Sequence, residues 1–282
     1  MAGGLHRCGA RADQVGAEVI QVFVANPRAW APPRADPDAD EAFAVSCAAA
    51  SRPVFVHTPY LINFGSPSPQ TLARSAEALV FSLRRGKAIG ARGVVLHAGS
   101  AVLGQHRTDA LAQTRVHLLR ALDAVPGAPP VLIEPTAGGG GALASNAASL
   151  AGFLDAIGRD ERIGICLDTC HMHASGHDMA TSAGFRAALR QFIRAAGSAR
   201  IGLVHVNDSR DAAGSLRDRH AGLGTGTIGR EPFRALFGTA ALRGVPFVVE
   251  TTDEQQGIDI AELKALRDVR PGPARRGQLS SA

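Results

Sequence analysis

The stretch GICLDTCHMHASGHD, residues 164–178, joins a run of apolar residues to a cluster of polar ones. The apolar run is typical of a buried strand, and it ends at Asp168. Three histidines, His171, His173 and His177, follow closely. Carboxylates and imidazoles are common ligands of transition metals. The stretch therefore predicts a strand that ends beside a metal site, if other strands of the chain end in the same way.

Apolar stretches of this kind recur along the whole chain and alternate with stretches of helical character. The expected strands are residues 18–24, 53–57, 93–97, 130–134, 163–168, 201–207 and 246–250. The expected helices are residues 41–50, 69–89, 107–124, 145–157, 181–196, 230–240 and 259–268, with a short helix within residues 1–16. Strands that alternate with helices indicate a parallel α/β fold.

Regular spacing of seven strand–helix units favours a barrel over a doubly wound sheet. A complete barrel of this kind has eight strands. The sequence therefore predicts a TIM (β/α)8 barrel that lacks its first strand, at the N-terminus. We expect residues 1–270 to form one barrel domain and residues 271–282, PGPARRGQLSSA, to form a disordered tail.

Composition narrows the class of protein. The chain has 282 residues, of which 45% are hydrophobic, and a formal net charge of +5. No apolar run approaches the roughly 18 residues that a membrane span needs, so we expect no membrane association and a cytoplasmic location. The four cysteines form no CxxC pair and no disulfide framework. The positive charge is compatible with a polyanionic partner.

Nearly every expected strand ends on a residue type that binds metals. These residues are His57, His97, Glu134, Asp168, His205 and Glu250. In a barrel the C-terminal ends of the strands converge on one face. Asp218 and His220 are two residues apart and share one face of an extended segment, while His171 follows Asp168 across a turn and is expected to serve a different ion. Mixed imidazole and carboxylate ligands suit Zn²⁺, with Mn²⁺ or Fe²⁺ as alternatives.

The charges of this set indicate an anionic substrate. The nine candidate ligands comprise four carboxylates and five imidazoles. Three divalent ions with a bridging hydroxide would leave a net charge of about +1. Such a centre suits a phosphodiester, because clustered metal ions activate water for attack on phosphorus.

Longer segments surround these candidate ligands. They are NPRAW (26–30), HTPYLIN (57–63), LHAGS (96–100), IEPTAGGG (133–140), LDTCHMHASGHD (167–178), HVNDS (205–209), DRHAGLGTGTIG (218–229) and PFVVET (246–251). Together they resemble the endonuclease IV family of three-zinc, TIM-barrel apurinic/apyrimidinic (AP) endonucleases. The resemblance runs from about residue 2 to residue 268. Two departures are the family's first strand, of the type GAHVS, which is absent, and Ala98, which replaces a usual proline.

The resemblance implies a role for each candidate ligand. The first zinc would be held by His57, His97 and Glu134, the second by Glu134, Asp168, His205 and Glu250, and the third by His171, Asp218 and His220. Glu134 and Glu250 are also expected to be catalytic. The reaction implied belongs to base excision repair: water activated by the metals attacks the phosphorus 5′ to an abasic site and leaves a 3′-hydroxyl and a 5′-deoxyribose phosphate. The partner implied is double-stranded DNA with abasic or 3′-blocked lesions, bound by a monomer.

The resemblance also implies DNA contacts. Arg28, Tyr60 and Leu61 match residues that the family inserts into the duplex at the lesion, where the missing base makes unstacking least costly. Arg219, between two ligand candidates, would meet a phosphate. The alternatives are an ordinary loop aromatic for Tyr60 and an exposed arginine without a ligand for Arg219.

Two other functions stay open. A sugar isomerase or epimerase of the xylose-isomerase-like barrel class would use fewer metal ions, and the DRH motif at 218–220 argues against it. A metal-bearing DNA-binding protein, inactive because its barrel is incomplete, is the non-catalytic alternative. The sequence GTGTIG at 224–229 fits a dinucleotide fingerprint, but it follows a loop rather than a strand.

Overall fold

Seven parallel strands form the centre of the molecule, which is a computed structural model that describes residues 4–102 and 106–268. The strands are β1 (Ile20–Phe23), β2 (Val54–His57), β3 (Gly93–His97), β4 (Val131–Glu134), β5 (Ile163–Asp168), β6 (Ile201–His205) and β9 (Phe247–Val248). They lie side by side in the order in which they occur in the chain, and each adjacent pair is parallel. The expected parallel α/β architecture is confirmed.

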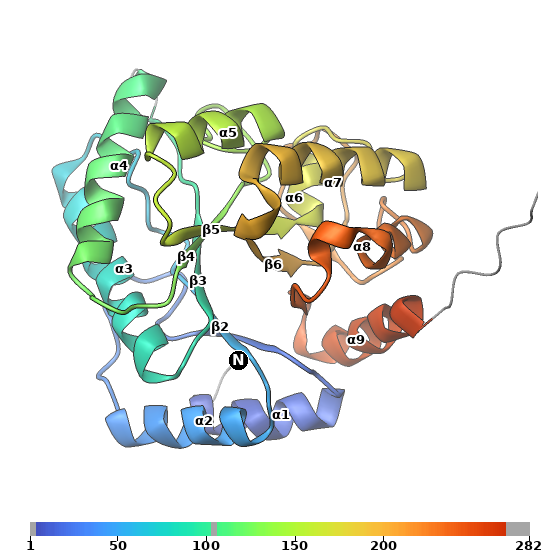
Figure 1. Cartoon of the computed structure of the whole chain (residues 1–282), viewed down its shortest axis with the longest axis horizontal. Helices are drawn as coiled ribbons and strands as arrows, with labels where there is room; N and C mark the ends of the chain where they lie inside the picture. Colours follow the sequence, from blue (N-terminus) through green and yellow to red (C-terminus); the bar gives the residue numbers. More distant parts are fainter. Residues whose placement is uncertain (1–3, 103–105, 269–282) are drawn as a thin grey trace, which may run out of the picture.

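Helices surround these strands in chain order (Figure 1). The α-helices are α1 (Cys8–Val15), α2 (Pro37–Ala49), α3 (Pro69–Ala88), α4 (Arg107–Asp123), α5 (Ala147–Ala156), α6 (Thr169–Ala174), α7 (Ser182–Ala196), α8 (Arg234–Gly238) and α9 (Asp253–Asp268). The 3-10 helices are η1 (Leu5–Arg7), η2 (Ser198–Arg200), η3 (Glu231–Phe233) and η4 (Ala240–Leu242). No helix in the described residues has the length and hydropathy to cross a membrane.

Local capping sets where the helices begin. Helix α3 begins at Pro69 because Ser68 accepts a hydrogen bond from the backbone N–H of Thr71 (3.3 Å) and proline suits the first helical position. Asp36 caps α2 in the same way, so this helix begins at Pro37, four residues before the predicted start. The prediction for the last helix was also too short, since α9 begins at Asp253.

The inside of the barrel is filled by a small apolar cluster that supports the site above it. The cluster consists of Phe55, Val95, Leu132, Cys166 and Leu203, with Val19 and Val248 packed against it. Gly93, Gly164 and Gly202 make room for Leu132, because a Cβ at any of them would lie within 2.8 Å of its side chain. Side chains of a strand alternate between its two faces. The residue two positions after each cluster residue therefore also points into the barrel, at its C-terminal mouth.

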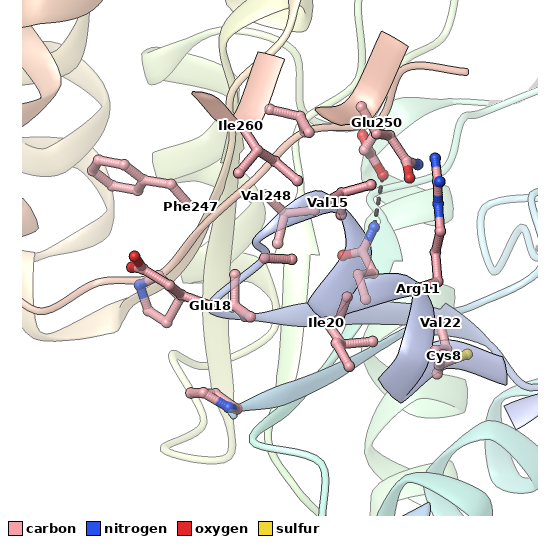
Figure 2. Close-up of a pocket in the computed structure, with 18 of the residues that line it drawn as sticks. Cys8, Arg11, Val15, Glu18, Ile20, Val22, Phe247, Val248, Glu250 and Ile260 are labelled. Carbon is pink, nitrogen blue, oxygen red and sulfur yellow. Dashed lines mark hydrogen bonds between the residues drawn. The ribbon is translucent and has the colours of Figure 1, made fainter. Parts of the chain in front are cut away.

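A gap separates β1 from β9, the two ends of the sheet. Among the described residues, β1 pairs only with β2 and β9 only with β6. A cavity of about 980 Å³ lies between them, lined by residues of β1, β9, α1 and α9 (Figure 2). Within the described residues the barrel therefore has seven strands, and the gap lies where the expected missing strand would close it.

The segment between β6 and α8 differs most from the predictions. No strand is expected between residues 207 and 246, but β7 (Asp208–Ser209) and β8 (His220–Ala221) form a short antiparallel pair there. The short helix α6, directly after β5, was also missed. The disordered tail predicted for residues 271–282 lies outside the described residues.

Candidate metal centre

The C-terminal mouth of the barrel brings together the side chains predicted at the strand ends. His57, His97, Glu134, Asp168 and His205 are the last residues of β2 to β6, and Glu250 lies two residues beyond β9. Three further candidates reach the mouth from connecting segments: His171 on α6, His220 on β8, and Asp218 just before β8. All nine fall into three groups whose potential ligand atoms lie within 4.8 Å of one another.

The first group combines His57, His97 and Glu134. The Nε2 atoms of the two histidines lie 3.2 Å and 3.4 Å from Oε2 of Glu134. Nδ1 of His57 faces the backbone oxygen of Thr58 at 2.8 Å, which leaves Nε2 directed at the carboxylate. His57 and Glu134 are buried and His97 is partly exposed, so the group opens toward solvent on one side.

The second group shares Glu134 with the first and adds Asp168, His205 and Glu250. Nδ1 of His205 lies 3.2 Å from Oε1 of Glu134, 3.8 Å from Oδ2 of Asp168 and 3.1 Å from Oε2 of Glu250. The two oxygens of Glu134 thus face different groups. Glu134 therefore belongs to both groups and could contact an ion in each.

The third group consists of His171, Asp218 and His220. The carboxylate of Asp218 lies between the two imidazoles, 3.2 Å from Nε2 of His171 and 2.9 Å from Nε2 of His220. Asp168 caps α6 through Oδ1, which accepts from the backbone N–H of His171 at 2.7 Å. Its other oxygen, Oδ2, lies 3.9 Å from Nε2 of His220. As the sequence predicted, the side chains of Asp168 and His171 diverge into different groups.

Burial and opposite charge compete at the carboxylates. Burial raises the pKa of Glu134, but the attraction of His205 and His97, with a hydrogen bond from His171, holds that pKa well below its ordinary value. Burial likewise opposes the charge of Glu250, whose pKa His205 lowers to about 2. These carboxylates are therefore anionic at neutral pH and need cations beside them.

The imidazoles show the opposite shift. Burial lowers the pKa of His171, but Asp168 and the hydrogen bond to Asp218 raise it well above its ordinary value. Burial also lowers the pKa of His220, while the hydrogen bond to Asp218 and the charge of Asp168 raise it to about 9. The nitrogen and oxygen atoms of each group lie within 4.8 Å of one another, close enough to share one ion. Divalent ions fit this set of nitrogen and oxygen donors, and Zn²⁺ matches its mixture of imidazole and carboxylate.

Two cysteines also lie near the groups. Cys166 lies beside Glu134 and His205, and Cys170 lies beside Asp168 and His220. Both are fully buried, and burial raises the pKa of each thiol to about 12. A protonated thiol is a poor ligand, so neither cysteine is counted among the candidate ligands.

Polar residues that the sequence analysis did not select hold the ligand candidates in place. Asn207 is buried, and its Nδ2 donates to Oδ2 of Asp168 at 2.6 Å and to Oε2 of Glu250 at 3.1 Å. Gln21 on β1 contacts both His205 and Glu250. The signal for Gln21 was a polar residue in the middle of the apolar run VIQVFV (19–24), and Asn207 lies two residues beyond the ligand candidate His205.

Asp208 organises the segment that follows His220. Its buried carboxylate accepts five backbone N–H bonds, at distances between 2.7 Å and 3.2 Å. The donors are Ser209, Gly224, Gly226, Ile228 and Gly229. A Cβ at Gly226 would lie 2.5 Å from Oδ1 of Asp208, so the glycine-rich sequence is explained by the tight wrapping of this loop around a carboxylate.

Residues predicted to contact DNA lie around the same mouth. Tyr60 is half exposed, its ring stacks on His97 with centroids 5.7 Å apart, and its backbone N–H donates to Pro27 in the loop that carries Arg28. Arg28 is exposed, and Leu61 is partly buried. Arg219 is exposed but forms a two-point ion pair with Asp211, so phosphate would have to compete with this carboxylate.

The other two histidines of the opening stretch lie outside the three groups. His173 is buried, with Nε2 3.1 Å from the hydroxyl oxygen of Thr227. His177 packs edge-on against Phe192 of α7. Neither imidazole is therefore a candidate ligand of the three groups.

Comparison with known proteins identifies the family. A family model described as a xylose isomerase-like TIM barrel matches residues 10–270. A protein of Streptomyces coelicolor named probable endonuclease 4 is 48% identical over 273 residues, covering 95% of this chain and 93% of that protein. The crystal structure of endonuclease IV from Thermus thermophilus is 30% identical, with a TM-score of 0.81, and the match covers 94% of this chain and 95% of that chain. An L-ribulose 3-epimerase structure is 20% identical with a TM-score of 0.67 and shares the fold, covering 93% of this chain and 90% of that one. The chain therefore belongs to the endonuclease IV family.

Proposed function

We propose that the protein is a zinc-dependent AP endonuclease of base excision repair. It would cleave the phosphodiester 5′ to an abasic site and leave a 3′-hydroxyl and a 5′-deoxyribose phosphate. The observation that carries this proposal is the set of three ligand groups at the barrel mouth, joined through Glu134, in a chain of the endonuclease IV family.

The residues proposed to hold three ions are the nine side chains of these groups. Bound divalent ions would supply Lewis acids and lower the pKa of water. Glu134 would contribute to two of the three sites, because it belongs to two of the ligand groups. Glu250, which accepts hydrogen bonds from Gln21 and Asn207, would contribute a carboxylate to the second site. Zn²⁺ suits all three groups, and Mn²⁺ or Fe²⁺ is the alternative at one or more of them.

Double-stranded DNA with an abasic or 3′-blocked lesion is the proposed substrate. Tyr60 projects beside His97 at the mouth and would fill the space of the missing base, with Leu61 and Arg28 next to it. Arg219 would meet a phosphate after release from Asp211. The net charge of +5 supports binding to a polyanion.

The proposal extends to the state of the protein. We propose that residues 1–270 act as a single domain, that the protein works as a monomer, and that it is cytoplasmic. The four cysteines are free and buried, which suits a reducing compartment.

The test combines metal analysis with incision of a duplex that contains one abasic site. We expect three ions per chain, incision on the 5′ side of the lesion, loss of incision with a chelator and recovery on adding Zn²⁺. His171→Ala should lose one ion and incision, whereas His177→Ala, a histidine of the same stretch outside the ligand groups, should keep both. Full metal content without incision would favour a DNA-binding protein, and turnover of a keto-sugar would favour an isomerase.

A further inference from the structure

Strand β1 contributes a glutamine at the position where the other barrel strands contribute a ligand candidate. On each of the other six strands, the ligand candidate lies two residues after an apolar residue. That apolar residue either belongs to the inner apolar cluster or packs against it. These pairs are Phe55 and His57, Val95 and His97, Leu132 and Glu134, Cys166 and Asp168, Leu203 and His205, and Val248 and Glu250. On β1 the matching pair is Val19 and Gln21. Gln21 therefore occupies the seventh place of the same ring.

The side chain of Gln21 connects the two free ends of the sheet. Its Nε2 donates to Oε1 of Glu250 at 2.7 Å, a bond drawn as a dashed line in Figure 2. Its Oε1 lies 2.8 Å from Nε2 of His205. Gln21 thus reaches from β1 to β6 and to the segment after β9, and both Gln21 and Glu250 line the cavity that separates β1 from β9.

This arrangement determines which nitrogen of His205 carries the hydrogen. The carboxylate of Glu250 can only accept, so the amide nitrogen of Gln21 must face it. The amide oxygen therefore faces His205, and Nε2 of His205 must be the donor. Nδ1 is then free to bind, and it is the atom that lies among the oxygens of Glu134, Asp168 and Glu250.

We propose that Gln21 is a positioning residue for the second metal site. This inference rests on the proposed function. By holding Nε2 of His205 and Oε1 of Glu250 together, Gln21 directs Nδ1 of the first and Oε2 of the second at one ion. A primary amide suits the task because it donates and accepts at once. Asn207 complements it from the other side, donating to Oε2 of Glu250 and accepting from its backbone N–H at 2.9 Å.

The test compares Gln21→Met with Val22→Ala in metal-loaded, full-length protein. Methionine keeps the length of the side chain and removes both hydrogen bonds. Val22 is the next residue of β1, faces the opposite side and packs in the core beneath the helices, so its truncation loosens the strand without touching a ligand. The readouts are zinc per chain and the affinity for the most weakly held ion, from competition with a chromogenic chelator.

We expect Gln21→Met to lower the affinity for one of the three ions by about 10- to 100-fold, which is the usual effect of removing a hydrogen-bond partner of a metal ligand. Val22→Ala should bind all three ions with wild-type affinity, even though urea unfolding should find it less stable than the wild type because it removes buried apolar atoms. Equal metal loss in both variants, or no metal loss in Gln21→Met, would overturn the role of Gln21. If the wild-type protein binds three ions in the same experiment, the proposed metal centre stands even though this inference fails. A wild type that binds no zinc would overturn the metal centre and the inference with it.

Discussion

Asp208 offers a sharp test of how the loop behind His220 is held. In Asp208→Asn, one carboxylate oxygen becomes an amino group. Oδ1 accepts from two buried N–H groups, those of Ser209 and Ile228, and Oδ2 accepts from three that are partly buried. The asparagine side chain loses least when its amide oxygen still accepts from Ser209 and Ile228. Its NH2 group then faces the three remaining backbone donors and cannot accept from them.

The cost follows from these three lost bonds. A buried donor left without an acceptor costs about 1–3 kcal/mol. Water reaches partly buried donors, so each should cost about 1 kcal/mol, at the lower end of that range. We therefore expect Asp208→Asn to reduce the free energy of unfolding by about 3 kcal/mol, measured by urea titration of the metal-free protein at neutral pH.

Asp178 provides the matched control for this measurement. Its exposed carboxylate also accepts three bonds, from the backbone N–H groups of Ala180 and Thr181 and from the hydroxyl of Thr181. Because solvent replaces bonds at an exposed loop, Asp178→Asn should cost less than about 1 kcal/mol. Equal losses in the two variants would show that wrapping around a buried carboxylate does not stabilise the loop.

Three further outcomes are expected. Tyr60→Ala should weaken binding to an abasic duplex at least about tenfold, because a stacking contact is lost, and should leave the zinc content unchanged. If fluorescence anisotropy finds an unchanged dissociation constant, Tyr60 does not contact the DNA. Arg28→Ala should reduce the slope of log affinity against log salt by about 0.9 if it meets one phosphate, and an unchanged slope would exclude that contact. Zinc binding to metal-free protein at pH 7 should release protons, because the pKa of His171 is raised well above its ordinary value and that of His220 to about 9. Since ligands bind deprotonated, apparent affinity should rise with pH up to about 9; calorimetry that shows no dependence on buffer ionisation would contradict this.

The barrel was predictable because its strands carry two signals at once. Each is a short apolar run, and most end on a residue type that binds metals, as PVLIE does at Glu134. The positions of those residues then followed from the rule that parallel strands in a barrel present their C-terminal ends together. The start of α2 could also have been read, because Asp36 followed by Pro37 is a common beginning of a helix.

The remaining features depend on contacts between distant segments. The pair β7–β8 has two residues in each strand, too few for any alternation of apolar and polar side chains to show. The role of Asp208 rests on donors up to 21 residues further along the chain, so no local pattern reveals it. Gln21 contacts His205 and Glu250, 184 and 229 residues away. The sequence showed only that Gln21 alternates with the buried residues Ile20 and Val22 and therefore points to the other face of β1.

The gap between β1 and β9 has a consequence for how stability is distributed in the sheet. In a closed barrel every strand has two hydrogen-bonded neighbours, whereas here each of these two has one among the described residues. Local opening needs the least free energy where a strand has the fewest partners. Protection of backbone amides should therefore be greatest in the middle, at β4, and decline toward both ends. Glu250 of the second ligand group follows β9, and Gln21, which donates to it, lies on β1. The part of the barrel mouth near these two strands should therefore open more readily than the part near β4.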